Sequence, residues 1–174
     1  MSEQALHDEL AARLDAARGP EAVWGVLRDG KLFARAVDEL AAPFREMRDL
    51  VVVAGPRDSA LLLGAAIAMR LQAGFAAVRG AGARLGGPKL RRVAGPDVTG
   101  LGEVLVLQVG TVRASDRILL VDDWREADHG LAASAGLVQG AGAEVAGVAV
   151  LVDALTGGDD GPPVHSLVHA GELA

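Results

Sequence analysis

The most informative stretch of the chain reads Arg117-Ile118-Leu119-Leu120-Val121-Asp122-Asp123-Trp124-Arg125-Glu126-Ala127-Asp128-His129-Gly130. The aliphatic run 118–121 is typical of a buried strand, and the Ala- and Gly-rich segment 131–141 that follows is typical of a helix. In open α/β sheets, ligands bind beyond the carboxyl ends of the strands, where the first turn of the next helix directs backbone N–H groups at anions. The stretch therefore predicts a phosphosugar site, with Asp122 and Asp123 at the exposed end of the strand.

Composition predicts a single α/β domain covering residues 1–174. The chain has 174 residues, of which 51% are hydrophobic and only 3% aromatic. A chain of this length can bury a full hydrophobic core without disulfides or structural metals. Small aliphatic residues also suit helices packed closely on a sheet. The chain has no cysteine, which excludes disulfides and thiolate metal sites.

Charge and hydropathy exclude two classes of partner. The net charge of −6 argues against broad binding of nucleic acid, which depends on a basic surface. No apolar run approaches the roughly 20 residues that a membrane span needs, and the first residues are acidic where a signal peptide is basic. We therefore expect no membrane contact and a cytoplasmic location.

Periodicity and turn residues predict the remaining elements. Helices are expected at 5–17 and about 31–47, and at 60–71, where Ser59 would be the N-cap. Strands are expected at 50–54, 75–78, 103–109, 117–121 and 144–152. The last of these is almost entirely Val and Ala, which indicates burial on both faces.

A Gly-rich segment at 79–102 separates two of these strands. Its first part holds five basic residues and no acidic one: Arg79, Arg84, Lys89, Arg91 and Arg92. A long loop in a compact domain is more often a functional lid than padding, so we expect a flexible loop here, with a short hairpin near 91–98. Arg84, Lys89, Arg91 and Arg92 fit solvated surface charges better than substrate contacts.

The strand ending in Asp122-Asp123 resembles the PRPP-binding motif of type I phosphoribosyltransferases. Collinear matches make the chain most similar to adenine phosphoribosyltransferases. These are the segment 27–44, Gly74-Phe75-Ala76-Ala77-Val78-Arg79, and the closing strand at 163–168. Gly55-Pro56-Arg57-Asp58-Ser59 occupies the pyrophosphate loop, where the family has Gly-x-Glu-Ala-Arg.

The resemblance implies a mostly parallel twisted sheet flanked by helices, with a small hood at 1–30 and a flexible loop at 79–102. It implies transfer of the 5-phosphoribosyl group of PRPP to a nucleobase, such as the purine adenine, with release of pyrophosphate. Asp122 and Asp123 would be the catalytic pair and would bind the ribose hydroxyls directly or through Mg²⁺, the implied cofactor. A homodimer is expected.

The remaining site residues follow from the same resemblance. Arg79, Arg57 and Ser59 would contact pyrophosphate, since a guanidinium fork matches phosphate oxygens. Ala127, Asp128, His129 and Gly130 stand where the family has Thr-Gly-Gly-Thr and would hold the 5′-phosphate. Here Asp128 adds a carboxylate to a phosphate cradle, which is electrostatically adverse.

Alternatives remain open at each of these positions. Asp122 and Asp123 also fit a pair that caps the next helix. His129 fits either a phosphate donor when protonated or an exposed turn residue. Trp124 fits core packing better than stacking on the substrate.

The altered loops also leave a second function open. The chain fits a phosphoribosyltransferase-fold protein with weak or no catalysis that binds PRPP or a nucleotide in a regulatory or assembly role. A third option, a phosphosugar-modifying enzyme of another α/β class, would require a catalytic residue that the sequence does not offer.

Overall fold

A seven-stranded mixed sheet forms the centre of the computed structural model, which describes residues 3–96, 102–126, 129–155 and 161–173. Its strands are β1 (Leu50–Ala54), β2 (Gly74–Gly80), β3 (Lys89–Pro96), β4 (Gly102–Gln108), β5 (Arg117–Arg125), β6 (Glu144–Asp153) and β7 (Val164–His169). Their order across the sheet is β3-β4-β2-β1-β5-β6-β7. Pairing is parallel from β2 to β7, whereas β4 pairs antiparallel with both β2 and β3. The expected mostly parallel α/β sheet is confirmed.

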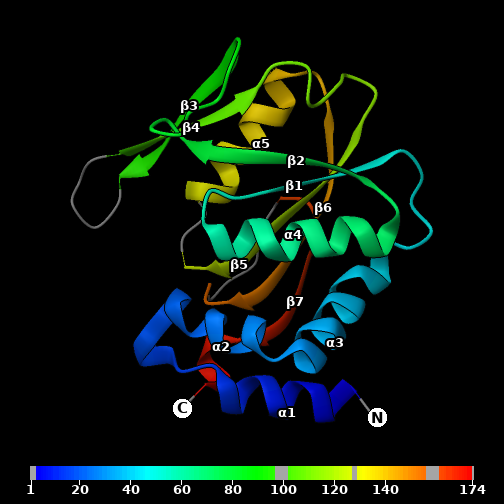
Figure 1. The fold of residues 1–174 in the computed structure, drawn as a ribbon, viewed down its shortest axis with the longest axis vertical. Coiled ribbons are helices and arrows are strands. Elements are labelled where there is room, and N and C mark those ends of the chain that lie inside the picture. Colours follow the sequence, from blue (N-terminus) through cyan, green and yellow to red (C-terminus); the bar gives the residue numbers. More distant parts are fainter. Residues whose placement is uncertain (1–2, 97–101, 127–128, 156–160, 174) are drawn as a thin grey trace.

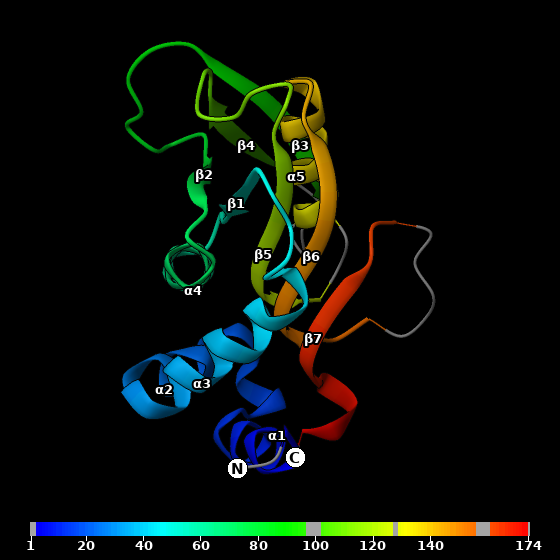
Figure 2. The same cartoon turned by 90° about the vertical axis from the view of Figure 1, so that its right-hand side faces the viewer.

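Helices cover both faces of this sheet (Figures 1 and 2). The α-helices are α1 (Glu3–Arg13), α2 (Val23–Arg28), α3 (Gly30–Ala41), α4 (Asp58–Leu71) and α5 (His129–Gly140), and three short 3-10 helices are η1 (Ala16–Ala22), η2 (Ala42–Phe44) and η3 (Ala170–Glu172). In Figure 2 α4 lies on one face and α5 on the other, while α1, α2 and α3 gather at the β7 end. No helix in the described ranges has the length and apolar character of a membrane span.

The core divides into two hydrophobic clusters, one on each face of the sheet. On the α3 and α4 face, Leu32, Leu40, Leu63 and Ile67 are fully buried against β1 and β5. The cluster under α5 contains Leu137 and Val138. A Cβ on Gly64 would lie 2.4 Å from Cβ of Ala54, so glycine lets α4 approach β1 closely. This contact holds the middle of α4 against the end of β1.

Several expected boundaries differ from the structure. The first helix ends at Arg13, and the chain then continues as η1 across Gly19, whose φ is 53°. The second helix, α3, ends at Ala41, because the turn at Pro43 converts it to η2. Residues 89–96, expected within a loop, form β3, which pairs with β4. The expected hairpin near 91–98 corresponds to this pair, although 97–101 lie outside the described residues.

The largest difference concerns the strand that carries the acidic pair. It was expected to end at Val121, but β5 continues to Arg125. Its ladder with β6 runs on through Asp122 opposite Val150 and Arg125 opposite Asp153. Asp122 and Asp123 therefore lie inside the last part of a strand rather than beyond its end.

Candidate active site

The loop that follows β1 lies beside the carboxyl-terminal end of β5, because the two strands are parallel neighbours and Ala54 pairs with Val121. The loop begins at Gly55, whose φ of +127° favours glycine. A Cβ there would lie 2.1 Å from the carbonyl oxygen of Val78, so no other residue fits against β2. The Gly55–Pro56 peptide bond is cis. The sharp turn at Gly55 brings Arg57 and Ser59 to the acidic pair.

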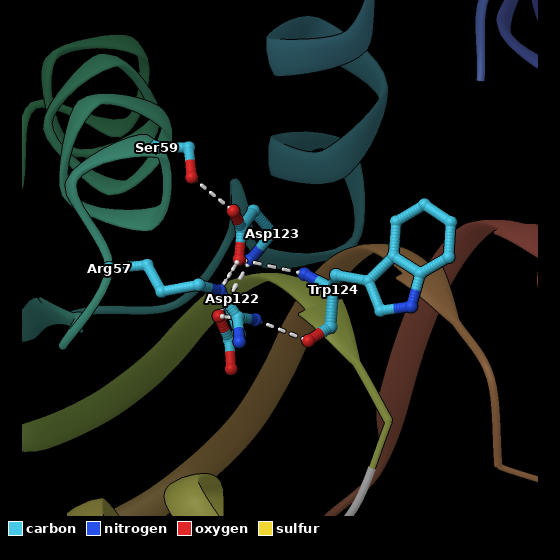
Figure 3. Close-up of polar contacts among 5 residues, drawn as sticks. All are labelled: Arg57, Ser59, Asp122, Asp123 and Trp124. Atoms are coloured by element: carbon cyan, nitrogen blue, oxygen red, sulfur yellow. Dashed lines mark hydrogen bonds and ion pairs between the residues drawn. The ribbon is translucent and has the colours of Figure 1, made fainter. Parts of the chain in front are cut away.

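Arg57 binds both carboxylates of the pair (Figure 3). Its Nε donates to Asp123 Oδ1 at 2.7 Å, and its Nη2 donates to Asp122 Oδ1 at 2.8 Å. Nη2 also donates to the carbonyl oxygen of Trp124. The Arg57 side chain is 37% exposed, and the hydrogen bonds to the carboxylates use only Nε and Nη2 of its guanidinium.

The carboxylates have further donors. The Ser59 hydroxyl donates to Asp123 Oδ2. The backbone N–H of Asp123 donates to Asp122 Oδ1, and that of Trp124 donates to Asp123 Oδ1, both at 2.9 Å. We call Arg57, Ser59, Asp122 and Asp123 the Arg57 cluster. Its hydrogen bonds engage both oxygens of Asp123 and one oxygen of Asp122.

Two expectations about these residues are wrong. Asp122 is 6% and Asp123 0% exposed, so the pair is buried and does not lie at an exposed strand end. Ser59 is not the N-cap of α4, because that position belongs to Arg57, whose φ of −67° and ψ of 147° are extended. Ser59 is itself buried in the first turn of α4, with its hydroxyl directed at Asp123.

Burial and opposite charge act against each other in the cluster. Burial raises the pKa of Asp122 well above its usual range, although the nearby guanidinium of Arg57 opposes this rise. For Arg57, burial disfavours the charged form, but the attraction of Asp122 and Asp123 outweighs it and raises the pKa of the guanidinium. The cluster carries a net charge of −1 when both carboxylates are ionised and is neutral when Asp122 is protonated, the form that burial favours.

The Arg57 cluster does not fit the expected magnesium ion. Mg²⁺ requires near-octahedral oxygen ligands and keeps several waters, which needs open carboxylate oxygens and space. Asp123 has no exposed surface, and its two oxygens already accept three hydrogen bonds. Within the described parts of the chain there is also no group of three or more acidic or histidine side chains that could hold a metal. A guanidinium occupies the position between the carboxylates instead.

Arg79 lies next to the same loop. It sits near the end of β2, where its Nη2 is 3.7 Å from Oδ1 of Asp58, the first residue of α4. Asp58 is largely exposed, so this is a surface ion pair that a ligand can displace at small cost. The structure thus brings Arg79, Arg57 and Ser59 together around the start of α4, as expected.

The other basic residues of 79–92 are dispersed. Arg92 lies against α5, because a Cβ on Gly136 would be 2.2 Å from its Cζ. Arg84, Arg91 and Arg92 are exposed, and Lys89 is half-buried. The expectation that these side chains are surface charges agrees with the exposure of the three arginines.

The expected 5′-phosphate loop is only partly visible. Ala127 and Asp128 lie outside the described residues, while His129 and Gly130 begin α5. The backbone of this first turn offers N–H groups at the carboxyl edge of β5. Trp124 is 3% exposed and packs in the core, as its alternative interpretation expected.

Sequence reasoning missed two features of this edge. It assigned Arg57 to pyrophosphate and not to the acidic pair, although an arginine after β1 and two aspartates at the end of the adjacent β5 were a signal of charge pairing. It also missed Arg125 and Asp153, which are opposite each other in the β5–β6 ladder and form a buried ion pair with Nη1 3.4 Å from Oδ2.

Comparisons with known proteins agree with this architecture. No protein-family model matches the chain. An adenine phosphoribosyltransferase of Synechococcus sp. (strain JA-3-3Ab) is 36% identical over 128 residues, which cover 74% of this chain and 71% of the relative. One from Xanthomonas oryzae pv. oryzae (strain PXO99A) is 36% identical over 130 residues, covering 75% and 68%.

A solved structure agrees as well. The crystal structure of adenine phosphoribosyltransferase from Rhodothermus marinus superposes with a TM-score of 0.74 at 27% identity, covering 83% of each chain. The chain therefore has relatives above 30% identity along most of its length. It combines this similarity with the strand order described above, the loop after β1 and the acidic pair on β5. The protein belongs to the adenine phosphoribosyltransferase family.

Proposed function

We propose that this protein transfers the 5-phosphoribosyl group of PRPP to adenine and releases pyrophosphate, a reaction of purine salvage. The single observation that carries the proposal is the family membership, since relatives at up to 36% identity are adenine phosphoribosyltransferases. The meeting of the β1–α4 loop with the acidic strand β5 supports it, because ligands of open α/β sheets bind at this edge.

In the proposed reaction the bond from ribose C1 to the pyrophosphate oxygen breaks, a ring nitrogen of the base bonds to C1, and the proton of that nitrogen leaves to the pyrophosphate or to solvent. Positive charge develops on the ribose ring, and negative charge leaves with pyrophosphate. Such a reaction needs positioning and charge compensation more than a covalent nucleophile. The solvent-facing edge of Arg57 and the guanidinium of Arg79 would bind the pyrophosphate oxygens.

The acidic pair would act on the ribose. Asp122 and Asp123 are held rigidly by Arg57, Ser59 and backbone N–H groups. Asp122 is the more accessible of the two, and only one of its oxygens accepts hydrogen bonds from described residues. We assign its other oxygen, Oδ2, to a ribose hydroxyl and Asp123 to the positioning of Arg57.

The 5′-phosphate would bind at the start of α5. Backbone N–H groups of His129 and Gly130, together with Ala127 and Asp128, would surround it, because a helix N-terminus favours anions. Magnesium, expected as a cofactor from the resemblance, takes no step in this mechanism because the Arg57 cluster does not fit it.

Further parts of the proposal concern the surroundings of the site. The segment η1 contacts β5, which supports residues 1–30 as a hood over this edge. Of the expected flexible segment 79–102, residues 89–96 form β3, so the part that would close as a lid is 81–88, between β2 and β3. Exposed Leu62 and Met69 on α4 and Phe75 on β2 support a homodimer, to be tested by light scattering. A cytoplasmic location stays a prediction.

The test is a base screen with the purified protein and PRPP. Adenine, guanine, hypoxanthine and uracil are supplied one at a time, with release of pyrophosphate and formation of nucleotide as readouts. We expect AMP with adenine and no product with uracil. Absence of product with every base would overturn the proposal.

A second candidate function is regulatory binding of PRPP or a nucleotide without catalysis. The observation that favours it is that Arg57 engages both carboxylates of the acidic pair. Calorimetric binding of PRPP without product formation in the base screen would establish this candidate in place of the first.

A further inference from the structure

The position between Asp122 and Asp123 is occupied by a cation that belongs to the chain itself. Arg57 Nε and Nη2 lie 2.7 Å and 2.8 Å from one oxygen of each carboxylate. Removing this guanidinium to admit a metal would break both charge-assisted bonds and the bond to the Trp124 carbonyl. The metal ion would then have to bind Asp123, a carboxylate with no exposed surface.

We infer that Arg57 replaces the divalent cation at the acidic pair, so that the protein binds a phosphorylated ribose without a metal ion on Asp122 or Asp123. This inference rests on the proposed function for its ligand, and on the geometry alone for the metal. The family resemblance does not supply this role for Arg57, because the position of Arg57 in the loop carries Glu in the family pattern.

The unused N–H donors of Arg57 can bind a ligand. A guanidinium has five N–H donors, of which Arg57 uses one on Nε and two on Nη2. The two donors on Nη1 have no acceptor among the described residues, and the side chain is 37% exposed. One arginine thus binds the carboxylates with one edge and offers the other to a pyrophosphate group. A bridging metal ion would connect the same two partners.

Ser59 completes the arrangement. Its hydroxyl holds the second oxygen of Asp123, so that Asp123 is fixed on both sides and presents Oδ1 to Arg57. In the family pattern the same loop position carries Arg. In this chain the arginine of the loop therefore stands two residues earlier, at position 57 instead of position 59. From there its guanidinium reaches the acidic pair.

The first experiment measures the metal without any ligand. Mn²⁺, a paramagnetic substitute for Mg²⁺, is titrated into the 174-residue protein, and free Mn²⁺ is followed by electron paramagnetic resonance. We expect no binding by the wild type, binding by Arg57→Gln, and loss of that binding when Asp123→Asn is added. Arg57→Lys is the matched control, because it keeps the positive charge and is expected to bind no Mn²⁺.

Two results would overturn the inference. One is stoichiometric binding of Mn²⁺ by the wild type that Asp123→Asn abolishes. The other is Arg57→Gln that is folded by circular dichroism and binds no Mn²⁺. If Arg57→Gln does not fold, the wild-type titration and Arg57→Lys decide alone: binding by either overturns the inference, and its absence in both supports it.

The second experiment separates the inference from the proposed function. PRPP is titrated calorimetrically into the wild type in Mg²⁺ and in EDTA. Similar affinities in both media support the inference. A loss of about tenfold or more in EDTA overturns it and leaves the proposed function standing. Absence of binding in both media overturns PRPP as the ligand, and the Mn²⁺ titration still decides the metal question.

Discussion

Two arginine–aspartate groups share the carboxyl-terminal end of β5, one with the start of α4 and the other with β6, and they differ in access to solvent. Arg57 bridges Asp122 and Asp123, and its side chain remains partly exposed. Arg125 and Asp153 are both buried, form a neutral pair at 3.4 Å and close the ends of β5 and β6.

The difference separates a ligand-binding group from a structural one. In both groups a guanidinium compensates the charge of buried carboxylates. Arg suits this role because its guanidinium is planar and only weakly hydrated. Of the two groups, only the Arg57 cluster has an arginine side chain that is partly exposed to solvent. A phosphorylated ligand can therefore interact with Arg57, whereas Arg125 contributes to the stability of the sheet edge.

The largest effect is expected from breaking the structural pair. Arg125→Ala leaves Asp153 at a buried position without its cation, and such a loss costs about 3–5 kcal/mol of unfolding free energy. Urea denaturation measures it. Arg125→Met with Asp153→Asn is the control and should recover part of the loss, since it removes both charges. A loss below about 1 kcal/mol would mean that the pair is not a buried structural pair.

Breaking the Arg57 cluster should cost less, because Arg57 is partly exposed. Arg57→Gln removes the cation from two buried carboxylates, and we expect a loss of about 2–4 kcal/mol, below the value for a fully buried pair. The matched control is Arg70→Gln, since the Arg70–Asp38 pair is half exposed on both sides and should lose less than about 1 kcal/mol. Equal losses in the two variants would contradict the burial argument.

A double change in the acidic pair sharpens the comparison further. Asp122→Asn with Asp123→Asn should abolish PRPP binding, measured by calorimetry, because it removes the group that positions Arg57 and accepts the ribose hydroxyl. The buried hydrogen bonds also make it destabilising, by about 1–3 kcal/mol. The affinity is therefore measured only on protein shown to be folded. Unchanged affinity would remove the main support for the site.

The phosphate loop gives a smaller, favourable effect. Replacing Ala127-Asp128-His129-Gly130 with Thr-Gly-Gly-Thr removes the carboxylate of Asp128 from the expected phosphate site. We expect PRPP binding to tighten by about tenfold, roughly 1.4 kcal/mol, after screening reduces the repulsion between like charges. His129→Thr alone keeps Asp128 and is the control. Flat or weaker binding of the full replacement would show that the loop suits another ligand.

The smallest effect is a slope with pH. The pKa of Asp122 is raised in the folded protein, mainly by burial, from its usual 3.8. Folding therefore favours the protonated form, and the stability that Asp122 contributes is present below about pH 4 and lost as pH rises through the raised pKa. Asp122→Asn does not titrate. The unfolding free energy of the wild type should thus fall relative to that of Asp122→Asn as pH rises, and the opposite slope would mean that Arg57 outweighs burial.

Much of the fold could be predicted from local pattern. The β-branched run 50–54 is β1, and the Val- and Ala-rich run 144–152 is β6 to within one residue. The helix after β1 and the helix after the acidic pair were also expected. These elements follow from side-chain periodicity and from Gly and Pro punctuation, which act over a few residues.

The predicted ends of helices and strands were wrong where a contact with a residue distant in sequence decides them. Val121 was expected to end its strand because Asp, Asp and Arg follow it. The ladder with β6 extends the strand to Arg125, since Val150 and Val152 pair with Asp122 and Trp124. Ser59 was expected to cap α4, but the nearby Asp123 carboxylate takes its hydroxyl. In both cases a tertiary contact outweighs a local preference.

The sequence by itself determined the fold class, the acidic pair and the family, because these depend on hydrophobic pattern and on the types of residues in one short stretch. Tertiary structure alone decided what the acidic pair does. Parallel pairing of β1 with β5 places Arg57 next to carboxylates that are 65 and 66 residues away in the chain, and the packing of α4 buries them. The charge state and metal preference of a carboxylate depend on its nearest charges and on its solvation, and both are set by how distant segments pack.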